Sequence, residues 1–86
     1  SVATVEIYTA DYCPYCHRAK RLLEKKNVAF KEYDVTVDPE GRAAMSQRAG
    51  GRSTVPQIFI NGQHVGGCDD LHFLEDQGKL DALLAG

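Results

Sequence analysis

The sequence predicts an α/β fold in which a mixed four-stranded sheet is flanked by helices. Its first half has the pattern strand–helix–strand, which predicts a parallel pair of strands joined by a right-handed crossover. Its second half has two short apolar runs around Asn61-Gly62, a dipeptide typical of hairpin turns, and then a helical pattern. With 86 residues, we expect one domain spanning residues 1–86.

The first strand and helix have clear boundaries. Residues 5–9 are β-branched and aromatic, as in a strand. Proline is favoured at the first helical position, so Pro14 predicts a helix whose N-cap is Cys13. An apolar stripe at helical spacing consists of Ala19, Leu22 and Leu23. The helix is expected to end near Asn27.

The middle of the chain predicts a second strand and a short polar helix. The strand falls within residues 28–37, and its expected packing residues are Phe30, Tyr33 and Val35. Asp38-Pro39-Glu40 is a helix-start signal, and Gly50-Gly51 ends that helix after Ala49. The apolar residues of this helix are Ala43, Ala44 and Met45.

The last third predicts a hairpin and a covering helix. Residues 55–60 form the third strand and residues 64–66 the fourth. Asp69-Asp70 opens a helix that Gly78 breaks, and an amphipathic turn follows. The apolar residues of these two segments are Leu71, Phe73, Leu74, Leu80, Leu83 and Leu84. The expected core includes Tyr8, Phe30, Phe59 and Ile60.

Composition argues against several classes of partner. The formal net charge is −2 with both signs interspersed, so no basic field predicts nucleic-acid binding. No apolar stretch approaches membrane-spanning length, and residues 1–9 lack the layout of a signal peptide. We therefore expect a cytoplasmic monomer that binds neither nucleic acid nor membrane.

The chemistry of the chain centres on Cys13-Pro14-Tyr15-Cys16. A Cys-x-x-Cys pair near a strand–helix–strand pattern is a redox signal. At a helix N-terminus, Cys13 faces free N–H groups, so we expect its pKa to fall below that of free cysteine. The nearby cations Arg18, Lys20 and Arg21 would add to this effect, and Asp11 would oppose it. Cys13 would then attack a disulfide and the less exposed Cys16 would resolve the mixed disulfide.

Other interpretations of the cysteine pair are weaker. The two cysteines could be buried as small apolar residues, but Pro14 and the helix start argue against this. Zinc needs four ligands, and Cys68 and the three histidines (His17, His64, His72) do not repeat the spacing. Cys13 to His17 also matches the haem-attachment pattern, but the chain is rich in strands and its one Met lies in a polar helix. We therefore expect no metal, and we expect His64 and His72 at the surface.

Three motifs in order resemble the glutaredoxin family. Cys13-Pro14-Tyr15-Cys16 is the tetrapeptide typical of dithiol glutaredoxins, whereas thioredoxins usually have a Trp before the first cysteine and this chain has none. Thr54-Val55-Pro56 matches the family's Thr-Val-Pro, whose proline is cis. Gly66-Gly67-Cys68-Asp69-Asp70 matches a third family segment, and the resemblance runs from Val5 to Leu84.

The resemblance implies a thioredoxin fold, a glutathione groove and glutathione as the reducing co-substrate. The implied substrates are glutathionylated and disulfide-bonded proteins. Within the groove, the backbone of Val55 would pair with the cysteinyl part of glutathione, and Cys68 and Asp69 would hold its γ-glutamyl end. The residues assigned to the groove by resemblance are Tyr15, Thr54, Val55, Pro56, Gly67, Cys68, Asp69 and Asp70.

One segment departs from the family pattern. Many glutaredoxins have a Lys upstream of the tetrapeptide that holds the glycine carboxylate of glutathione, but this chain has Ala10-Asp11-Tyr12. The candidates to replace it are Arg52, Gln47 and Arg48.

Two rival functions remain open. One is a thioredoxin recycled by a flavoprotein reductase, and the other is a binding protein that holds an iron–sulfur cluster between two protomers.

Overall fold

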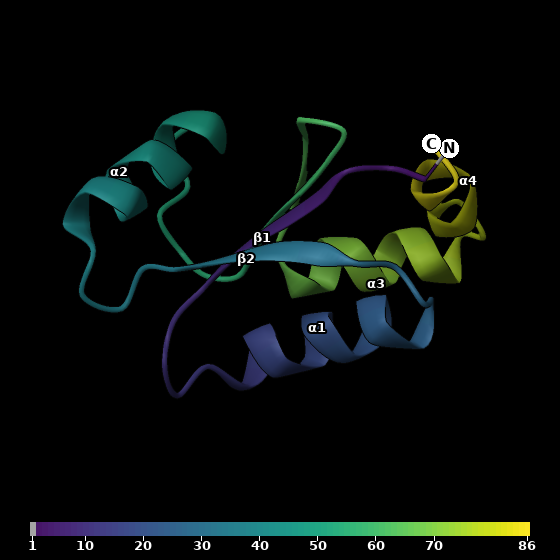
Figure 1. Cartoon of the computed structure of the whole chain (residues 1–86), viewed down its shortest axis with the longest axis horizontal. Coiled ribbons are helices and arrows are strands. Elements are labelled where there is room, and N and C mark those ends of the chain that lie inside the picture. Colours follow the sequence, from purple (N-terminus) through teal and green to yellow (C-terminus); the bar gives the residue numbers. More distant parts are fainter. Residues whose placement is uncertain (1) are drawn as a thin grey trace.

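The computed structural model describes residues 2–86 and has the predicted order of elements (Figure 1). The strands are β1 (Val5–Thr9), β2 (Phe30–Asp34), β3 (Gln57–Ile60) and β4 (Gln63–Gly66). The helices are α1 (Pro14–Lys25), α2 (Pro39–Arg48), α3 (Cys68–Asp76) and α4 (Leu80–Leu84).

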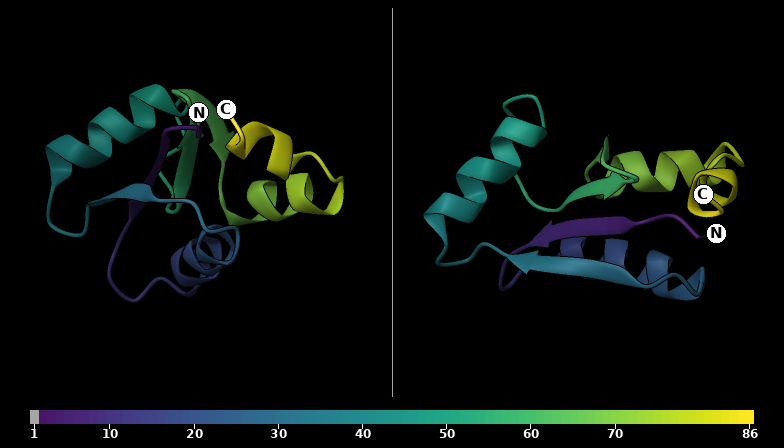
Figure 2. Two further views of the ribbon diagram at one scale, coloured as in Figure 1. Left: turned by 45° about the vertical axis from the view of Figure 1, so that its right-hand side comes forward. Right: turned by 45° about the horizontal axis from the view of Figure 1, so that its top comes forward.

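The four strands form one mixed sheet in the order β2-β1-β3-β4 (Figure 2). β1 pairs with β2 in parallel, as the crossover through α1 requires. β1 with β3, and β3 with β4, are antiparallel. The hairpin turns at Asn61 and Gly62, which both have positive φ (53° and 78°), as predicted for this dipeptide. The mixed four-stranded sheet is therefore confirmed.

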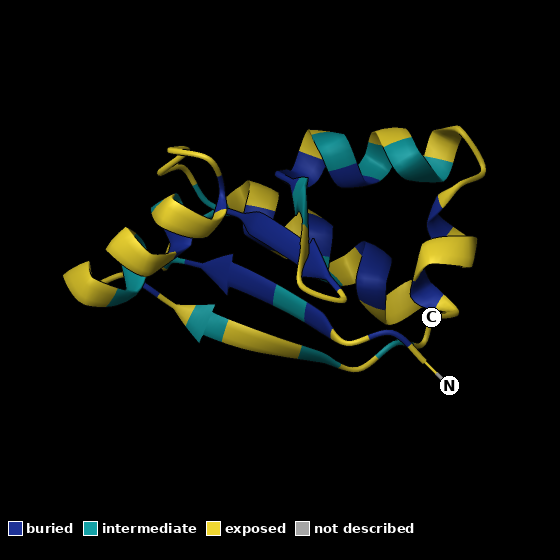
Figure 3. Cartoon of the chain, turned by 90° about the horizontal axis from the view of Figure 1, so that it is seen from above, coloured by how far each residue is buried: buried dark blue, intermediate teal, exposed yellow. Residues whose placement is uncertain are grey.

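Alternation along the two central strands gives the sheet two different faces. Val5 and Ile7 of β1 pack with Ile58 of β3 into the cluster covered by α1, α3 and α4. On the other face, Tyr8 of β1 and Phe59 of β3 pack with Val35, which follows β2. Helix α2 covers this face through Met45 and its C-cap Ala49. Figure 3 shows the burial concentrated in the central strands, whereas β2 at the edge is largely exposed. Helices thus cover both faces, as predicted.

The starts of β3 and α3 differ from the prediction, as do, by one residue each, the start of β4 and the end of α2. β3 begins at Gln57 and not at residue 55, because Pro56 has no N–H to contribute to a ladder. α3 begins at Cys68 with Gly67 as its N-cap, so Asp69 is not the capping residue. Instead the carboxylate of Asp70 accepts a hydrogen bond from the Gly67 N–H at 2.8 Å.

A few side chains also depart from the expected burial. In α2, Met45 is buried, as is the C-cap Ala49, but Ala43 and Ala44, which were expected to supply apolar contacts, are exposed. His64 is partly buried, because it hydrogen-bonds within the molecule. His72 is partly buried as well, and its Nε2 lies out of solvent.

The ends of the described chain are joined to the rest of the fold. The Ala3 N–H donates to the Leu84 carbonyl at 3.1 Å, so α4 lies beside the start of β1. Lys26, which follows α1, pairs with Glu75 at 2.7 Å and with Asp81 at 2.8 Å. Within residues 2–86, no helix is long and apolar enough to cross a membrane.

Candidate active site

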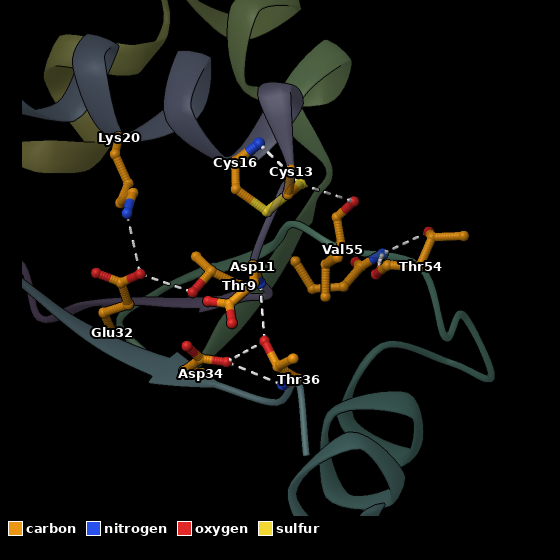
Figure 4. The surroundings of a disulfide bond; sticks show 11 residues. Thr9, Asp11, Cys13, Cys16, Lys20, Glu32, Asp34, Thr36, Thr54 and Val55 are labelled. Atoms are coloured by element: carbon orange, nitrogen blue, oxygen red, sulfur yellow. Dashed lines mark hydrogen bonds and ion pairs between the residues drawn. A yellow bond between two sulfur atoms is a disulfide. The ribbon is translucent and has the colours of Figure 1, made fainter. Parts of the chain in front are cut away.

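The centre of the site is a disulfide between Cys13 and Cys16 at the start of α1 (Figure 4). Cys13 is the N-cap and Pro14 occupies the first turn, as predicted. The Cα atoms of the two cysteines are 5.2 Å apart, and the Cys16 N–H points at Cys13 Sγ at 3.1 Å. Cys16 is only 2% exposed and Cys13 is partly exposed, so the expected difference in access is present.

The loop that leads to Cys13 is tied to the end of β2. The backbone N–H of Asp11 donates to Thr36 Oγ1 at 2.7 Å. Thr36 in turn donates to Asp34 Oδ1 from its N–H at 2.8 Å and from its hydroxyl at 2.6 Å (Figure 4). These local hydrogen bonds hold the approach to Cys13 against the sheet without using the cysteine itself.

A second connection fixes α1 on the sheet. Glu32 of β2 accepts a hydrogen bond from the Thr9 hydroxyl at 2.6 Å. It also forms an ion pair with Lys20, whose Nζ lies 3.0 Å from Glu32 Oε2. The Thr9 hydrogen bond and, to a smaller degree, Lys20 lower the pKa of Glu32. We expected Lys20 to add positive charge near Cys13. Instead its ammonium group is paired with Glu32.

The segment before Pro56 lies against the disulfide. The Val55–Pro56 peptide is cis, as the resemblance implies, and the Val55 carbonyl oxygen lies 3.9 Å from Cys13 Sγ. Within the described chain, the Val55 N–H donates no hydrogen bond. Both backbone groups of Val55 are therefore available to an extended ligand next to the sulfur.

Gln57, which the sequence analysis did not single out, holds this segment in place. Its side chain is fully buried, and Nε2 donates to the Thr54 carbonyl at 3.0 Å and to Thr54 Oγ1 at 3.3 Å. Arg42 holds the preceding residue, because its guanidinium donates to the Ser53 carbonyl at 2.6 Å. The sequence did contain a clue to this role, because Gln57 is the one polar residue in the otherwise apolar segment 57–60.

A groove of about 150 Å³ opens beside the disulfide. It brings together all eight residues that the resemblance assigned to glutathione, and Arg52 joins them. Its lining is Tyr15, Arg52, Thr54, Val55, Pro56, Gly67, Cys68, Asp69 and Asp70. Three separate segments of the chain therefore meet at one hollow, and their roles in binding remain predictions.

The charges at the groove come from Arg52 and the start of α3. Arg52 Nη1 pairs with Asp70 Oδ2 at 3.2 Å. The Gly67 N–H, followed by Arg52, holds the pKa of Asp70 below its usual value. Gly66 has a φ of 124°, and a Cβ there would collide with the Asp70 carboxylate. Burial raises the pKa of Cys68, so its thiol stays protonated beside the groove.

Only one of the three candidates for the missing Lys lies at this groove. Arg52 lines it, whereas Arg48 pairs with Glu6 at 2.9 Å on the face covered by α2. Gln47 is exposed and is not part of the lining. As for metals, residues 2–86 contain no group of three or more His, Cys, Asp or Glu side chains placed to hold an ion.

Comparison with known proteins assigns the family. The glutaredoxin family model matches residues 5–65. Glutaredoxin 3 of Escherichia coli strain K12 is 55% identical over 83 residues, covering 96% of this chain and 99% of that protein. The solution structure of a glutaredoxin from Brucella melitensis superposes with a TM-score of 0.86 at 58% identity, covering 99% of this chain and 91% of that one.

A second similar structure, lower in identity, is that of a complex with a ligand. It is a crystal structure of a buckwheat glutaredoxin–glutathione complex, with a TM-score of 0.85 at 32% identity, covering 95% of this chain and 76% of that one. The TM-scores show that the sheet and the helices agree with those of these relatives. This chain belongs to the glutaredoxin family, and it is a thiol–disulfide oxidoreductase with Cys13 and Cys16 as its adjacent cysteine pair.

Proposed function

We propose that this chain uses glutathione to reduce glutathione mixed disulfides and protein disulfides. The observation that carries the proposal is the groove that meets the disulfide at Val55 and contains every residue assigned to glutathione by resemblance. The buckwheat relative, which was solved as a glutathione complex, supports the same ligand.

The backbone of Val55 sets the position of the ligand in this proposal. Its free N–H and its carbonyl can pair with the cysteinyl residue of glutathione, as an added strand would. Because the Val55 carbonyl oxygen is 3.9 Å from Cys13 Sγ, this pairing would bring the ligand's sulfur close to Cys13. Gln57 keeps the segment in position through Thr54.

The charged groups of glutathione have candidate partners in the groove. Arg52, which also pairs with Asp70, is the cation proposed for the glycine carboxylate. Free N–H groups at the start of α3 suit the γ-glutamyl carboxylate, and Asp69 suits its ammonium. Asp70 already accepts hydrogen bonds from Gly67 and Arg52, so its role is to hold the groove's shape.

In the reaction with a glutathione mixed disulfide, Cys13 alone is needed. Its thiolate attacks the glutathionyl sulfur, the Sγ–S bond forms, and the substrate thiolate leaves and takes up a proton. A second glutathione thiolate then attacks the glutathionyl sulfur on Cys13. Glutathione disulfide forms, and the Cys13 thiolate is regenerated.

Protein disulfides require both cysteines. Cys13 attacks one substrate sulfur and releases the other as a thiol, and Cys16 then attacks Cys13 Sγ. The second substrate thiol leaves, so two electrons have passed from the cysteine pair to the substrate, and the pair is left as the Cys13–Cys16 disulfide seen here. Two glutathione molecules reduce this disulfide in turn.

A coupled assay tests the proposal. Glutathione, glutathione reductase and NADPH are supplied with a small glutathione mixed disulfide, and NADPH consumption is followed. We expect turnover with the wild type, none with Cys13→Ser, and most of the activity with Cys16→Ser. In the control assay, thioredoxin reductase replaces both glutathione and glutathione reductase, and NADPH consumption is followed in the same way. Turnover only with thioredoxin reductase, or a Cys16→Ser variant as inactive as Cys13→Ser, would contradict the proposal.

A further inference from the structure

One side of α1 carries three cations that form no ion pair among the described residues, and the guanidinium of one of them, Arg18, lies 5.9 Å from the centre of the Tyr15 ring. Arg18, Arg21 and Lys25 are all exposed, and their spacing of three and four residues places them on one side of the helix. We call these three residues the cationic face. It begins one turn after Cys13 and follows the helix away from the disulfide.

The neighbouring cations behave differently. Lys20 pairs with Glu32, and Lys26 pairs with Glu75 and Asp81. Among the described residues, no ion pair includes Arg18, Arg21 or Lys25. Since the whole chain has a net charge of −2, this is a local concentration of positive charge and not a general property of the surface.

Two shallow hollows meet on this side of the helix. The first, of about 560 Å³, is lined by Tyr12, Cys13, Pro14, His17, Arg18 and Arg21. The second, of about 400 Å³, is lined by Arg18, Arg21, Leu22, Lys25, His72 and Glu75. Because they share two arginines, they form one continuous depression that starts at Cys13. Neither hollow shares a lining residue with the glutathione groove.

An aromatic side chain stands at the start of this depression. Tyr12 directly precedes Cys13, is 100% exposed and has a φ of 55°. Exposed tyrosines next to cations are typical of protein-binding surfaces, because the ring offers apolar contact area and a hydroxyl together. The depression therefore combines contact area, positive charge and the reactive sulfur.

We propose that the cationic face docks an acidic segment of a protein substrate whose disulfide is reduced at Cys13. The proposal rests on the proposed function and adds the class of protein that the site prefers. Opposite charges beside the reacting bond raise the rate of productive encounter and orient the substrate. A protein is favoured over a nucleic acid because the cations are few and the target bond is a disulfide.

The test compares two peptides of equal length that each contain one internal disulfide. In one peptide Asp and Glu flank the cysteines, and in the other Asn and Gln replace them. We expect the wild type to reduce the acidic peptide with a kcat/KM roughly fivefold or more above that of the neutral peptide at low salt. The ratio should fall towards one as ionic strength rises.

Variants then locate the effect. The double variant R21E/K25E should lose the preference or reverse it, and R21Q/K25Q should weaken it with less perturbation of the helix. The matched control is K31E/K79E, which makes the same charge change at two exposed lysines outside the cationic face. In the control variant, the ratio of kcat/KM for the acidic peptide to kcat/KM for the neutral peptide should fall only slightly, because the net charge of the protein becomes more negative. The ratio is the readout because it cancels any change in the reactivity of Cys13 itself.

Three results would overturn the proposal. One is an equal kcat/KM for both peptides in the wild type at low salt, and another is a preference that survives in R21E/K25E. The third is binding of single-stranded nucleic acid that depends on Arg21 and Lys25, with no peptide preference. Activity on a small glutathione mixed disulfide is measured in parallel with all variants. Its absence in the wild type would refute the proposed function, whereas its presence without a peptide preference refutes the docking surface alone.

Discussion

His64 and Gln57 share a short hydrogen bond, with 2.6 Å between His64 Nε2 and Gln57 Oε1. The Gln57 amide nitrogen faces the Thr54 carbonyl, which can only accept, so the amide oxygen faces His64. His64 Nε2 therefore carries the proton and donates it. This chain of contacts connects β4 to the segment that lines the groove beside the disulfide.

Gln57→Leu should weaken substrate binding more than it slows the reaction. The variant removes both hydrogen bonds to Thr54 and leaves His64 without its acceptor, at a cost of about 1–3 kcal/mol in the free energy of unfolding. With the Val55 segment less fixed, the KM for a glutathione mixed disulfide should rise and kcat should change little. Denaturant unfolding and steady-state kinetics measure the two effects, and Gln47→Leu at an exposed position is the control. An unchanged KM would show that Gln57 is only structural.

His64 should titrate below the ordinary histidine value of 6.5. Burial is the main cause of its lowered pKa, Arg52 adds to it, and Asp70 opposes it. The folded protein then binds a proton less readily than the unfolded chain, so the contribution of His64 to stability is present above about pH 6.5 and declines as the pH falls. An NMR titration of the His64 ring gives the pKa directly, and Arg52→Ala should raise it. A wild-type midpoint at or above 6.5 would refute this prediction.

Arg52→Ala should raise the KM for a glutathionylated substrate by roughly threefold to tenfold with little change in kcat, since it removes the cation of the groove that we propose for the glycine carboxylate. Stability should change by about 1 kcal/mol or less, because both partners of the Arg52–Asp70 pair are about half exposed. Adding Ala10→Lys should restore part of the affinity by returning the cation to its usual place in the family, and in the wild type this change alone should lower the KM. Failure of Ala10→Lys to lower the KM in either background would argue against a carboxylate contact.

Arg48→Ala should have the opposite profile. Arg48 pairs with Glu6, donates to the Tyr8 hydroxyl at 2.8 Å and lies 4.1 Å from the centre of the Phe59 ring. Its loss should lower the free energy of unfolding by about 1–3 kcal/mol and leave the KM unchanged, because the contact lies on the α2 face. A raised KM in Arg48→Ala would place this residue in the glutathione site after all.

The Glu6 carboxylate gives this ion pair a pH dependence. Hydrogen bonds from Arg48 and then from Tyr33 lower the pKa of Glu6 below its ordinary value of 4.5. The stabilisation is therefore present above pH 4.5 and lost as the pH falls through the folded-state value. The difference in stability between wild type and Glu6→Gln should be full at pH 7 and shrink below about pH 4. A difference that does not change with pH would mean that packing, and not charge, is lost in Glu6→Gln.

The pKa of reduced Cys13 should lie below that of a free cysteine. It caps α1, and the Cys16 N–H points at its sulfur. Ultraviolet titration of reduced Cys16→Ser, in which Cys68 is buried with a raised pKa, should give a midpoint below the value of about 8.5 for free cysteine. A midpoint near 8.5 or higher would remove the electrostatic basis of the proposed mechanism.

Much of the fold could be predicted from local patterns. Pro14 located the start of α1, Asn61-Gly62 located the hairpin, and the order of the elements predicted a sheet with helices on both faces. These features depend on the preferences of neighbouring residues, so they are readable along the chain. The observed start of α3 lies one residue before the predicted one. The reason is that the Asp70 carboxylate, at the third helical position, accepts a hydrogen bond from the N–H of the N-cap Gly67.

The sequence by itself determined the order of elements, the helix start under Cys13 and the residues that match a glutathione groove. Tertiary structure alone decided which cation reaches the groove: Lys20 and Arg48 are engaged by partners 12 and 42 residues away, while Arg52 lines the groove and pairs there with Asp70. It also decided the role of Gln57, whose partners lie in another strand and a loop. The reason is physical, since an ion pair or a buried hydrogen bond depends on which distant residue the fold brings within about 3 Å.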